Sequence, residues 1–231
     1  MKNKKTLKII ALVIAVAMFL PAATACKEIG ALKNLADGLQ NIAEDWQKYE
    51  DMMKKLTNYK ITMTTVNNGG NPETYTEQRC EQGYGFLANE SITYVEYGTG
   101  KFYVLSVTEK TGMVFEHEND DAYKSFGLIT SGYLMMFQSA RFFGAEKDGT
   151  DKILGRKTTC YKGEIEGNEA RFWIDDEYGI TMKFTSKSES GEVSSMEVTE
   201  FKTGGVKLSD IVNLGDYEIT DLNSIVDGFN G

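Results

Sequence analysis

From Asn58 onward, apolar and polar side chains alternate along short runs, and glycine or polar pairs separate most of these runs. Such alternation places apolar side chains on one face of a β-strand and polar side chains on the other. Parallel neighbours need long crossovers, and most connections here are short, so we expect successive strands to pair antiparallel. The expected strands cover residues 59–66, 73–80, 84–88, 91–97, 101–108, 112–116, 152–165, 168–175, 179–188 and 192–203.

Two segments follow a helical period instead. Residues 28–57 carry apolar side chains three and four positions apart, which places them on one stripe of a long helix. The stripe consists of Leu32, Leu35, Leu39, Ile42, Trp46, Tyr49, Met53 and Leu56. It suits a helix that lies on a sheet, or a helix that pairs with another helix. Residues 122–143 predict a second helical region that is apolar on more than one face.

These elements together indicate the α+β class. Twist accumulates across a wide sheet and makes it curl. We therefore expect a wide curved antiparallel sheet, an incomplete barrel, that is wrapped around helices and preceded by a long N-terminal helix. The expected domains are a signal peptide over 1–25, a lipid-anchored helix over 26–57 and an antiparallel half-barrel over 58–231 that contains the helical segment 122–143.

The first 25 residues follow the plan of a secretory signal peptide. Residues 1–8 are basic, residues 9–20 are an unbroken apolar run, and Pro21 and small residues follow. The apolar run is shorter than the roughly 20 residues that span a bilayer. Export is therefore the favoured prediction, and an N-terminal transmembrane anchor is the alternative.

Cys26 follows the small residues 22–25, and this arrangement resembles a bacterial lipobox. An acylated Cys26 anchors the protein to the outer face of a membrane in the cell envelope, because each buried methylene contributes about 0.8 kcal/mol. Ala23-Thr24-Ala25 also suits ordinary signal peptidase, and in that case the protein is secreted without a lipid.

The formal net charge of −9 limits the partners. An acidic surface repels phosphate backbones, which argues against nucleic acid as a partner. It also argues against adsorption to anionic lipid by charge alone. The expected partners are a membrane, reached through the N-terminal lipid, and an apolar small ligand.

The sequence contains few groups that could perform catalysis. His117 is the one histidine, and it lies within the acidic run 116–121, which predicts a solvated loop better than a metal site. Residues 175–177 are three acids at one turn, where exposed carboxylates are the usual outcome. No phosphate-binding loop, dinucleotide fingerprint or calcium loop is present. We expect no enzyme, no cofactor and no metal.

Cys80 and Cys160 both fall in expected strands. An exported protein can form disulfides, so the two residues could be paired. Two buried free thiols are the other interpretation, and the sequence favours it slightly. Their spacing matches no metal-ligand pattern.

Residues 153–184 resemble part of a known family. The segments Ile153-Leu-Gly-Arg-Lys-Thr-Thr-Cys-Tyr161, Ala170-Arg-Phe-Trp-Ile-Asp175 and Gly179-Ile-Thr-Met-Lys-Phe184 are similar to the C-terminal half of the outer-membrane lipoprotein-sorting carrier superfamily. The order of lipobox, helix, strands, helices and strands is also similar. The resemblance implies an incomplete barrel around helices, with space between them for acyl chains, and implies no catalytic residue.

The segment 133–137 is the predicted ligand-binding region. Methionine is flexible and fills irregular apolar space, including sites that accept varied ligands. The candidates are Tyr133, Leu134, Met135, Met136 and Phe137. Ordinary core packing is the alternative role for them. The expected function is a surface-anchored lipoprotein domain that binds a lipid or other apolar ligand; the alternative is a cell-envelope protein-interaction or regulatory module.

Overall fold

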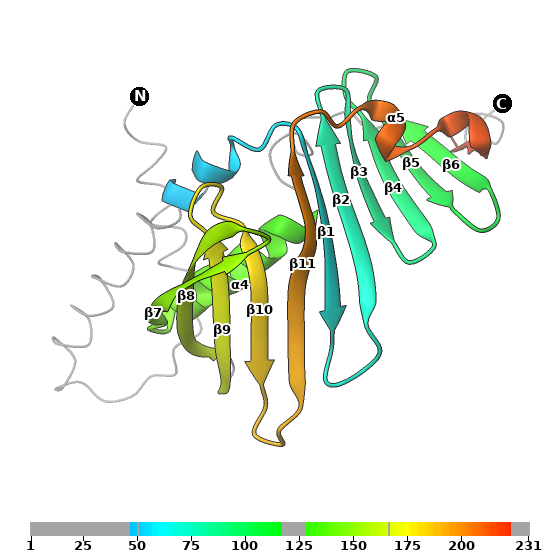
Figure 1. The fold of residues 1–231 in the computed structure, drawn as a ribbon. Helices are drawn as coiled ribbons and strands as arrows, with labels where there is room; N and C mark the ends of the chain where they lie inside the picture. The colour runs from blue at the N-terminus through cyan, green and yellow to red at the C-terminus, as the bar shows by residue number, and fades with distance from the viewer. Residues whose placement is uncertain (1–46, 50, 117–127, 166, 223–231) are drawn as a thin grey trace, which may run out of the picture. The chain divides into compact units, whose positions relative to one another are not determined.

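The computed structural model describes residues 47–49, 51–116, 128–165 and 167–222, and a single sheet of 12 strands dominates this part of the chain (Figure 1). In chain order the strands are β1 (Tyr59–Val66), β2 (Glu73–Cys80), β3 (Gly83–Ala88), β4 (Ser91–Glu96), β5 (Lys101–Ser106), β6 (Thr111–Glu116), β7 (Glu146–Ile153), β8 (Arg156–Ile165), β9 (Asn168–Asp175), β10 (Thr181–Lys187), β11 (Val193–Thr203) and β12 (Glu218–Asp221). Within the sheet they are ordered β12-β6-β5-β4-β3-β2-β1-β11-β10-β9-β8-β7.

Strand β1 joins the two halves of the sheet. It pairs antiparallel with β2 on one side and with β11 on the other, so residues 59–66 lie beside residues 195–203. The register between β1 and β11 shifts at Thr62/Met63, where a bulge occurs. Every other pair of neighbours is also antiparallel, except that β12 runs parallel to β6.

Short turns make the hairpins. Leu154 and Gly155 connect β7 to β8, and their φ angles of 51° and 76° both lie in the left-handed region. Two such residues form the tight turn whose twist matches paired strands. The sequence predicted one strand over 152–165, and this turn divides that segment between two strands.

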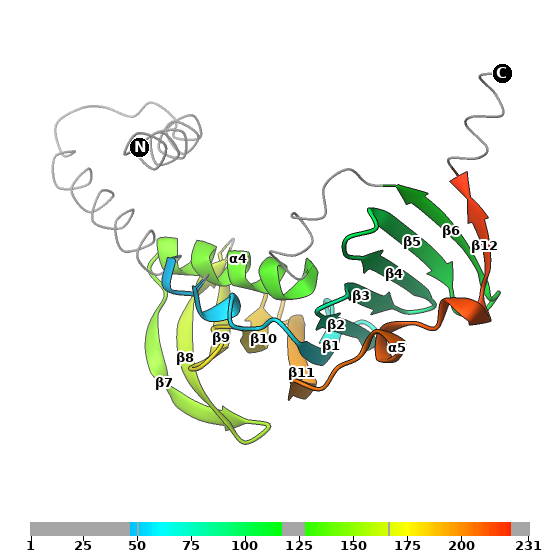
Figure 2. The same cartoon turned by 90° about the horizontal axis from the view of Figure 1, so that it is seen from above.

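The described helices are short. Helix α4 (Leu128–Phe142) lies beside β8–β11 (Figure 2), and Leu134, Phe137 and Ala140 from it are buried among sheet side chains. Helix α5 (Leu208–Ile211) and the 3₁₀ turn η1 (Leu214–Asp216) follow β11. No helix within the described ranges has the length and apolar character of a membrane span.

Two hydrophobic cores lie against opposite faces of the sheet. The first contains Ile61 and the buried side chains of α4. The second contains Tyr94 and the segment 206–219. Ile61 of the first core is the cross-strand partner of Glu77. Tyr94 of the second core is paired with Gly85, which is paired with Gln78. Adjacent residues of a strand point to opposite faces, so Glu77 lies on the face of the first core and Gln78 on the face of the second.

The predicted fold, an incomplete antiparallel barrel wrapped around helices, is wrong. Within the described part of the chain the sheet is open and mixed, and β12 and β7 each have a neighbouring strand on one side only. The physical reason is that the apolar side chains change faces along the sheet, so that each half is covered separately. The edge strand β7 is exposed at seven of its eight positions, and its charged sequence EKDGTDKI opposes further pairing.

The long N-terminal helix predicted over residues 28–57 is not found among the described residues. Residues 47–49 and 51–53 are helical, and a turn follows directly. Tyr49 and Leu56 are buried in the first core, as the apolar stripe predicted. After this turn the side chain of Asn58 bonds to the backbone of Val206 in both directions, at 2.9 Å each, and these bonds fix the start of β1.

The remaining domain predictions lie partly outside the described residues. The predicted signal peptide 1–25 and residues 26–46 are outside them, and so are residues 122–127 of the predicted helical segment. The other part of that segment corresponds to α4.

Candidate functional site

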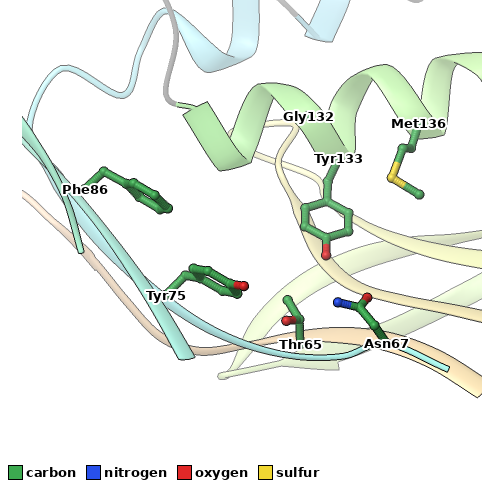
Figure 3. Close-up of a pocket in the computed structure, with 7 residues that line it drawn as sticks. All are labelled: Thr65, Asn67, Tyr75, Phe86, Gly132, Tyr133 and Met136. Atoms are coloured by element: carbon green, nitrogen blue, oxygen red, sulfur yellow. The ribbon is translucent and has the colours of Figure 1, made fainter. Parts of the chain in front are cut away.

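A pocket of about 330 Å³ lies between α4 and the strands β1–β3 (Figure 3). Seven of the described residues, from four parts of the chain, line it, and none of the seven is charged. They are Thr65, Asn67, Tyr75, Phe86, Gly132, Tyr133 and Met136. The described lining is therefore aromatic and apolar, with a small number of neutral polar groups.

The helical period explains which side chains of α4 reach the pocket. Tyr133 and Met136 are three positions apart and share one side of the helix. Leu134 and Phe137 lie on the adjoining side, where they pack into the first core. Gly132 has no side chain, and a Cβ built on it meets nothing within 4 Å. A larger side chain at Gly132 would therefore find open space at the border of the pocket.

Ring contacts hold the aromatic walls in place. Tyr75 and Phe86 stack with their ring centroids 6.1 Å apart and their planes 5° apart. The ring of Tyr133 lies 5.9 Å from that of Phe184 in the first core. Such contacts restrict ring rotation, so the walls are preorganised.

The polar groups of the pocket gather on the side of β1. In Figure 3 the hydroxyl of Tyr133 points toward Asn67, and the hydroxyl of Tyr75 points toward Thr65. The Tyr75 hydroxyl donates a hydrogen bond to the carboxylate of Glu73, and this bond raises the pKa of Tyr75. Burial, with a smaller effect of Tyr75, raises the pKa of Tyr133. Both tyrosines are therefore neutral at physiological pH.

The structure separates the five residues that the sequence singled out. Tyr133 and Met136 line the pocket. Leu134 and Phe137 are 4% and 0% exposed and belong to the core, whereas Met135 is 60% exposed on the outer side of α4. A ligand role for any of the five stays a prediction.

Sequence reasoning missed the strand residues of the pocket. Tyr75 and Phe86 meet because β2 and β3 form a hairpin in which Glu77 is paired with Phe86 and Tyr75 with Ala88. This register places Tyr75 and Phe86 diagonally on one face. The short connection between the two expected strands could have predicted this hairpin and, with it, the pairing that brings Tyr75 near Phe86.

The acidic turn at 175–177 agrees with its prediction at Asp176 and Glu177, which are exposed, and differs from it at Asp175. Asp175 was expected to be exposed, but it is 1% exposed and forms an ion pair with Arg156 at 2.6 Å. It also accepts the backbone N–H groups of Glu177 and Tyr178, at 3.0 and 2.7 Å. The carboxylate of Asp175 is therefore a structural anchor of the turn.

Other sequence candidates are free thiols or lie outside the described residues. Cys80 and Cys160 are buried and unpaired with each other, which resolves the two interpretations in favour of free thiols. Cys26 and His117 lie outside the described residues. Within the part of the chain that the structure describes, no group of three or more His, Cys, Asp or Glu side chains could hold a metal.

No protein-family model matches the sequence, and no curated protein matches it. Membership of the lipoprotein-sorting carrier superfamily therefore stays a prediction.

Several solved structures show a likeness in fold at low identity. An uncharacterised conserved protein from Thermus thermophilus has 10% identity and a TM-score of 0.45, over 76% of this chain and 98% of that chain. A chain of the Pseudomonas aeruginosa MucA/MucB complex has 13% identity and a TM-score of 0.42, over 75% of this chain and 63% of that chain. The Mycobacterium tuberculosis lipoprotein LppX has 13% identity and a TM-score of 0.36, over 73% of this chain and 98% of that chain.

Proposed function

We propose that this domain binds a small apolar or amphiphilic molecule in the pocket beneath α4. The observation that carries the proposal is the lining itself: Tyr75, Phe86, Tyr133 and Met136 surround a space that opens next to a helical glycine. Ligand sites are usually apolar concavities with a few orienting polar groups, and about 300 Å³ is the lower end of their size range. The pocket therefore suits one slender chain or ring system better than a bulky lipid. The proposal includes no catalytic step.

Binding can be tested with N-phenyl-1-naphthylamine, an uncharged probe whose fluorescence rises in apolar surroundings. We expect the purified protein to bind it saturably. Gly132→Leu should weaken binding at least about tenfold, because the new side chain enters the open space beside Gly132. Ser139→Leu adds the same side chain at an exposed position of α4 and serves as the matched control. Equal affinities for the two variants would refute binding in this pocket.

Native mass spectrometry provides a second test of the same proposal. We expect the purified protein to carry a co-purifying small molecule, or to take up an added fatty alcohol, with one molecule bound per chain. The Gly132→Leu variant should show neither adduct, while Ser139→Leu should show both. An adduct that persists in Gly132→Leu would place the ligand elsewhere.

We further propose that the domain is exported and anchored to the outer face of a membrane through a lipid on Cys26. The support is the basic, apolar and small-residue order of residues 1–25 before that cysteine. Growth with labelled palmitate should label the protein, and Cys26→Ser should abolish the label. An unlabelled wild-type protein would contradict the anchor and leave a secreted protein.

A second candidate function is protein interaction, and one sheet face favours it. Val104 is paired with Met113, and Phe102 with Phe115, so these four apolar side chains share one face of β5 and β6. Met113 is 45% exposed, and the other three are partly exposed. A photo-crosslinking residue at Met113 should capture a defined protein in intact cells if this face binds a partner. The same residue at exposed Thr199 on β11 is the control, and equal capture at both positions would contradict the idea.

A further inference from the structure

We infer that the pocket beneath α4 selects its ligand by headgroup charge, accepting uncharged or cationic heads and rejecting anionic ones, and that Glu73 determines this selection. The inference names the ligand class of the site proposed above and rests on that proposal. It is carried by the position of Glu73 relative to the polar side of the pocket.

Glu73 lies on the pocket face of the sheet. It is the cross-strand partner of Thr65, which lines the pocket. It is also two residues before Tyr75, so Glu73 and Tyr75 point to the same face of β2. The bond from the Tyr75 hydroxyl to the Glu73 carboxylate confirms this orientation. The carboxylate therefore stands next to the polar groups that would meet a headgroup.

No described cation balances that carboxylate. None of the ion pairs among the described residues includes Glu73. The part of the lining that the structure describes contains no lysine or arginine. Arg141 is the one cation in α4, and it is five residues beyond Met136, with its guanidinium on the carbonyl of Ala145 and over the ring of Tyr161. An anionic head would thus meet a like charge with no described counter-charge in the pocket wall.

The direction of the hydrogen bond points to the same ligand class. Tyr75 gives its hydroxyl proton to Glu73, so the oxygen of Tyr75 presents lone pairs to the pocket. The Glu73 carboxylate is itself an acceptor only. A hydroxyl or ammonium head can donate to these oxygens, whereas a carboxylate head cannot. Fatty alcohols, acylglycerols and cationic amphiphiles fit this chemistry, and fatty acids do not.

The test compares three competitors that have the same ten-carbon chain. Decanol, decylammonium and decanoate are each titrated against N-phenyl-1-naphthylamine bound to the purified protein at pH 7.5, below the solubility limit of decanol and the micelle concentrations of the two ions. We expect decanoate to compete at least about tenfold more weakly than decanol, and decylammonium to compete at least as well as decanol. Equal competition by decanoate and decanol in the wild-type protein would overturn the inference without any variant.

Two charge-matched variants assign the effect to one residue. Glu73→Gln removes the carboxylate charge and keeps an oxygen that can accept the Tyr75 hydrogen bond. Glu200→Gln removes the same charge from β11 and serves as the control. Glu200 is the cross-strand partner of Thr62, which lies on the opposite face of the sheet from Thr65 and Glu73. We expect Glu73→Gln to bring decanoate within about threefold of decanol and Glu200→Gln to leave the wild-type ratio unchanged.

The outcomes of this experiment separate the two proposals. If neither the probe nor any competitor binds the wild-type protein, the proposed function itself fails. If all bind and both variants change the decanoate ratio equally, the selection follows net charge and Glu73 does not determine it. Thermal denaturation of both variants checks that they are folded. If Glu73→Gln does not fold, the comparison of decanoate with decanol in the wild-type protein still tests the inference.

Discussion

Arg156 and Asp175 are joined by two hydrogen bonds, from Nε to Oδ2 at 2.6 Å and from Nη2 to Oδ1 at 3.0 Å. The guanidinium also lies 4.9 Å from the ring centre of Tyr178 and 4.8 Å from that of Phe201. A planar cation can make the paired bonds and the ring contacts together, and an ammonium group cannot. This arrangement ties the start of β8 to the end of β9 and to β11.

Removing the carboxylate of Asp175 should therefore destabilise the fold. We expect Asp175→Ala to lower the free energy of unfolding by about 3 kcal/mol, because it leaves two backbone N–H groups without their acceptor and leaves Arg156 with only the exposed carboxylate of Glu177. Lys157→Ala removes the neighbouring exposed pair with Asp176 and should cost less than about 1 kcal/mol. Urea denaturation measures both changes. Equal losses would show that the buried pair has no special role.

The contact between Gly85 and Ile211 gives a prediction about the second core. A Cβ on Gly85 would lie 2.1 Å from Cγ2 of Ile211, so Gly85→Ala should push α5 away from the sheet. We expect a loss of about 1–3 kcal/mol in unfolding free energy. Ile211→Ala removes the obstructing atom, and Gly85→Ala should cost much less in that background. Additive effects in the double-mutant cycle would contradict this close packing.

The buried tyrosines predict a loss of stability at high pH. Burial and the neighbouring Glu77 carboxylate raise the pKa of Tyr59 well above its ordinary value, and its hydroxyl donates to Glu77. Above about pH 10 the unfolded chain loses the Tyr59 proton while the folded protein keeps it. The unfolding free energy then falls as pH rises, by about 1.4 kcal/mol per pH unit for such a tyrosine.

Tyr59→Phe tests this contribution. The variant should be less stable at neutral pH by about 1–3 kcal/mol, because Glu77 loses a donor. Its stability should nevertheless fall less steeply than that of the wild-type protein between about pH 10 and 11. Urea midpoints across this range measure the slope, with Tyr217→Phe at a half-buried tyrosine as the control. Parallel slopes for Tyr59→Phe and the wild type would contradict the assignment.

Cys80 and Cys160 should remain unmodified thiols in the folded protein. Four strands separate β2 from β8, so the two cysteines are roughly 24 Å apart, far beyond the about 7 Å between Cα atoms that a disulfide allows. Both are buried, and burial raises the pKa of Cys160. Iodoacetamide should label them slowly in buffer and rapidly in urea. A peptide that joins Cys80 to Cys160 in the mass spectrum would refute this prediction.

Periodicity in the sequence was sufficient for strands with one buried face. The predicted bounds of β1, β2 and β9 agree with the structure, since apolar and polar residues alternate through β1 and β9 and buried residues recur along the second half of β2. It was insufficient for β7, because seven of its eight residues are exposed and no alternation exists to detect. The four-residue strand β12 was missed because it is polar apart from Ile219 and pairs with a distant part of the chain.

The candidate site was predictable only from its helical side. The composition of residues 133–137 pointed to Tyr133 and Met136, but α4 is apolar on several faces, so its periodicity could not separate them from exposed Met135 or buried Phe137. The strand residues depend on register, which the sequence specifies only through hairpin length. The barrel prediction failed for a similar reason, since no local signal reveals that the covered face of the sheet changes.

The pairing of β1 with β11 has a consequence for how the molecule assembles. Residues 59–66 are made early, but their partner strand, residues 195–203, arrives last among the long strands. The β2–β6 hairpins join neighbours in the chain and can form at once, while closing the β1–β11 seam must wait and is slow. Until then β1 offers a bare strand edge to other copies. A truncation before residue 193 would leave that edge permanently open, so an incompletely synthesised chain should aggregate even though most of its hairpins are intact.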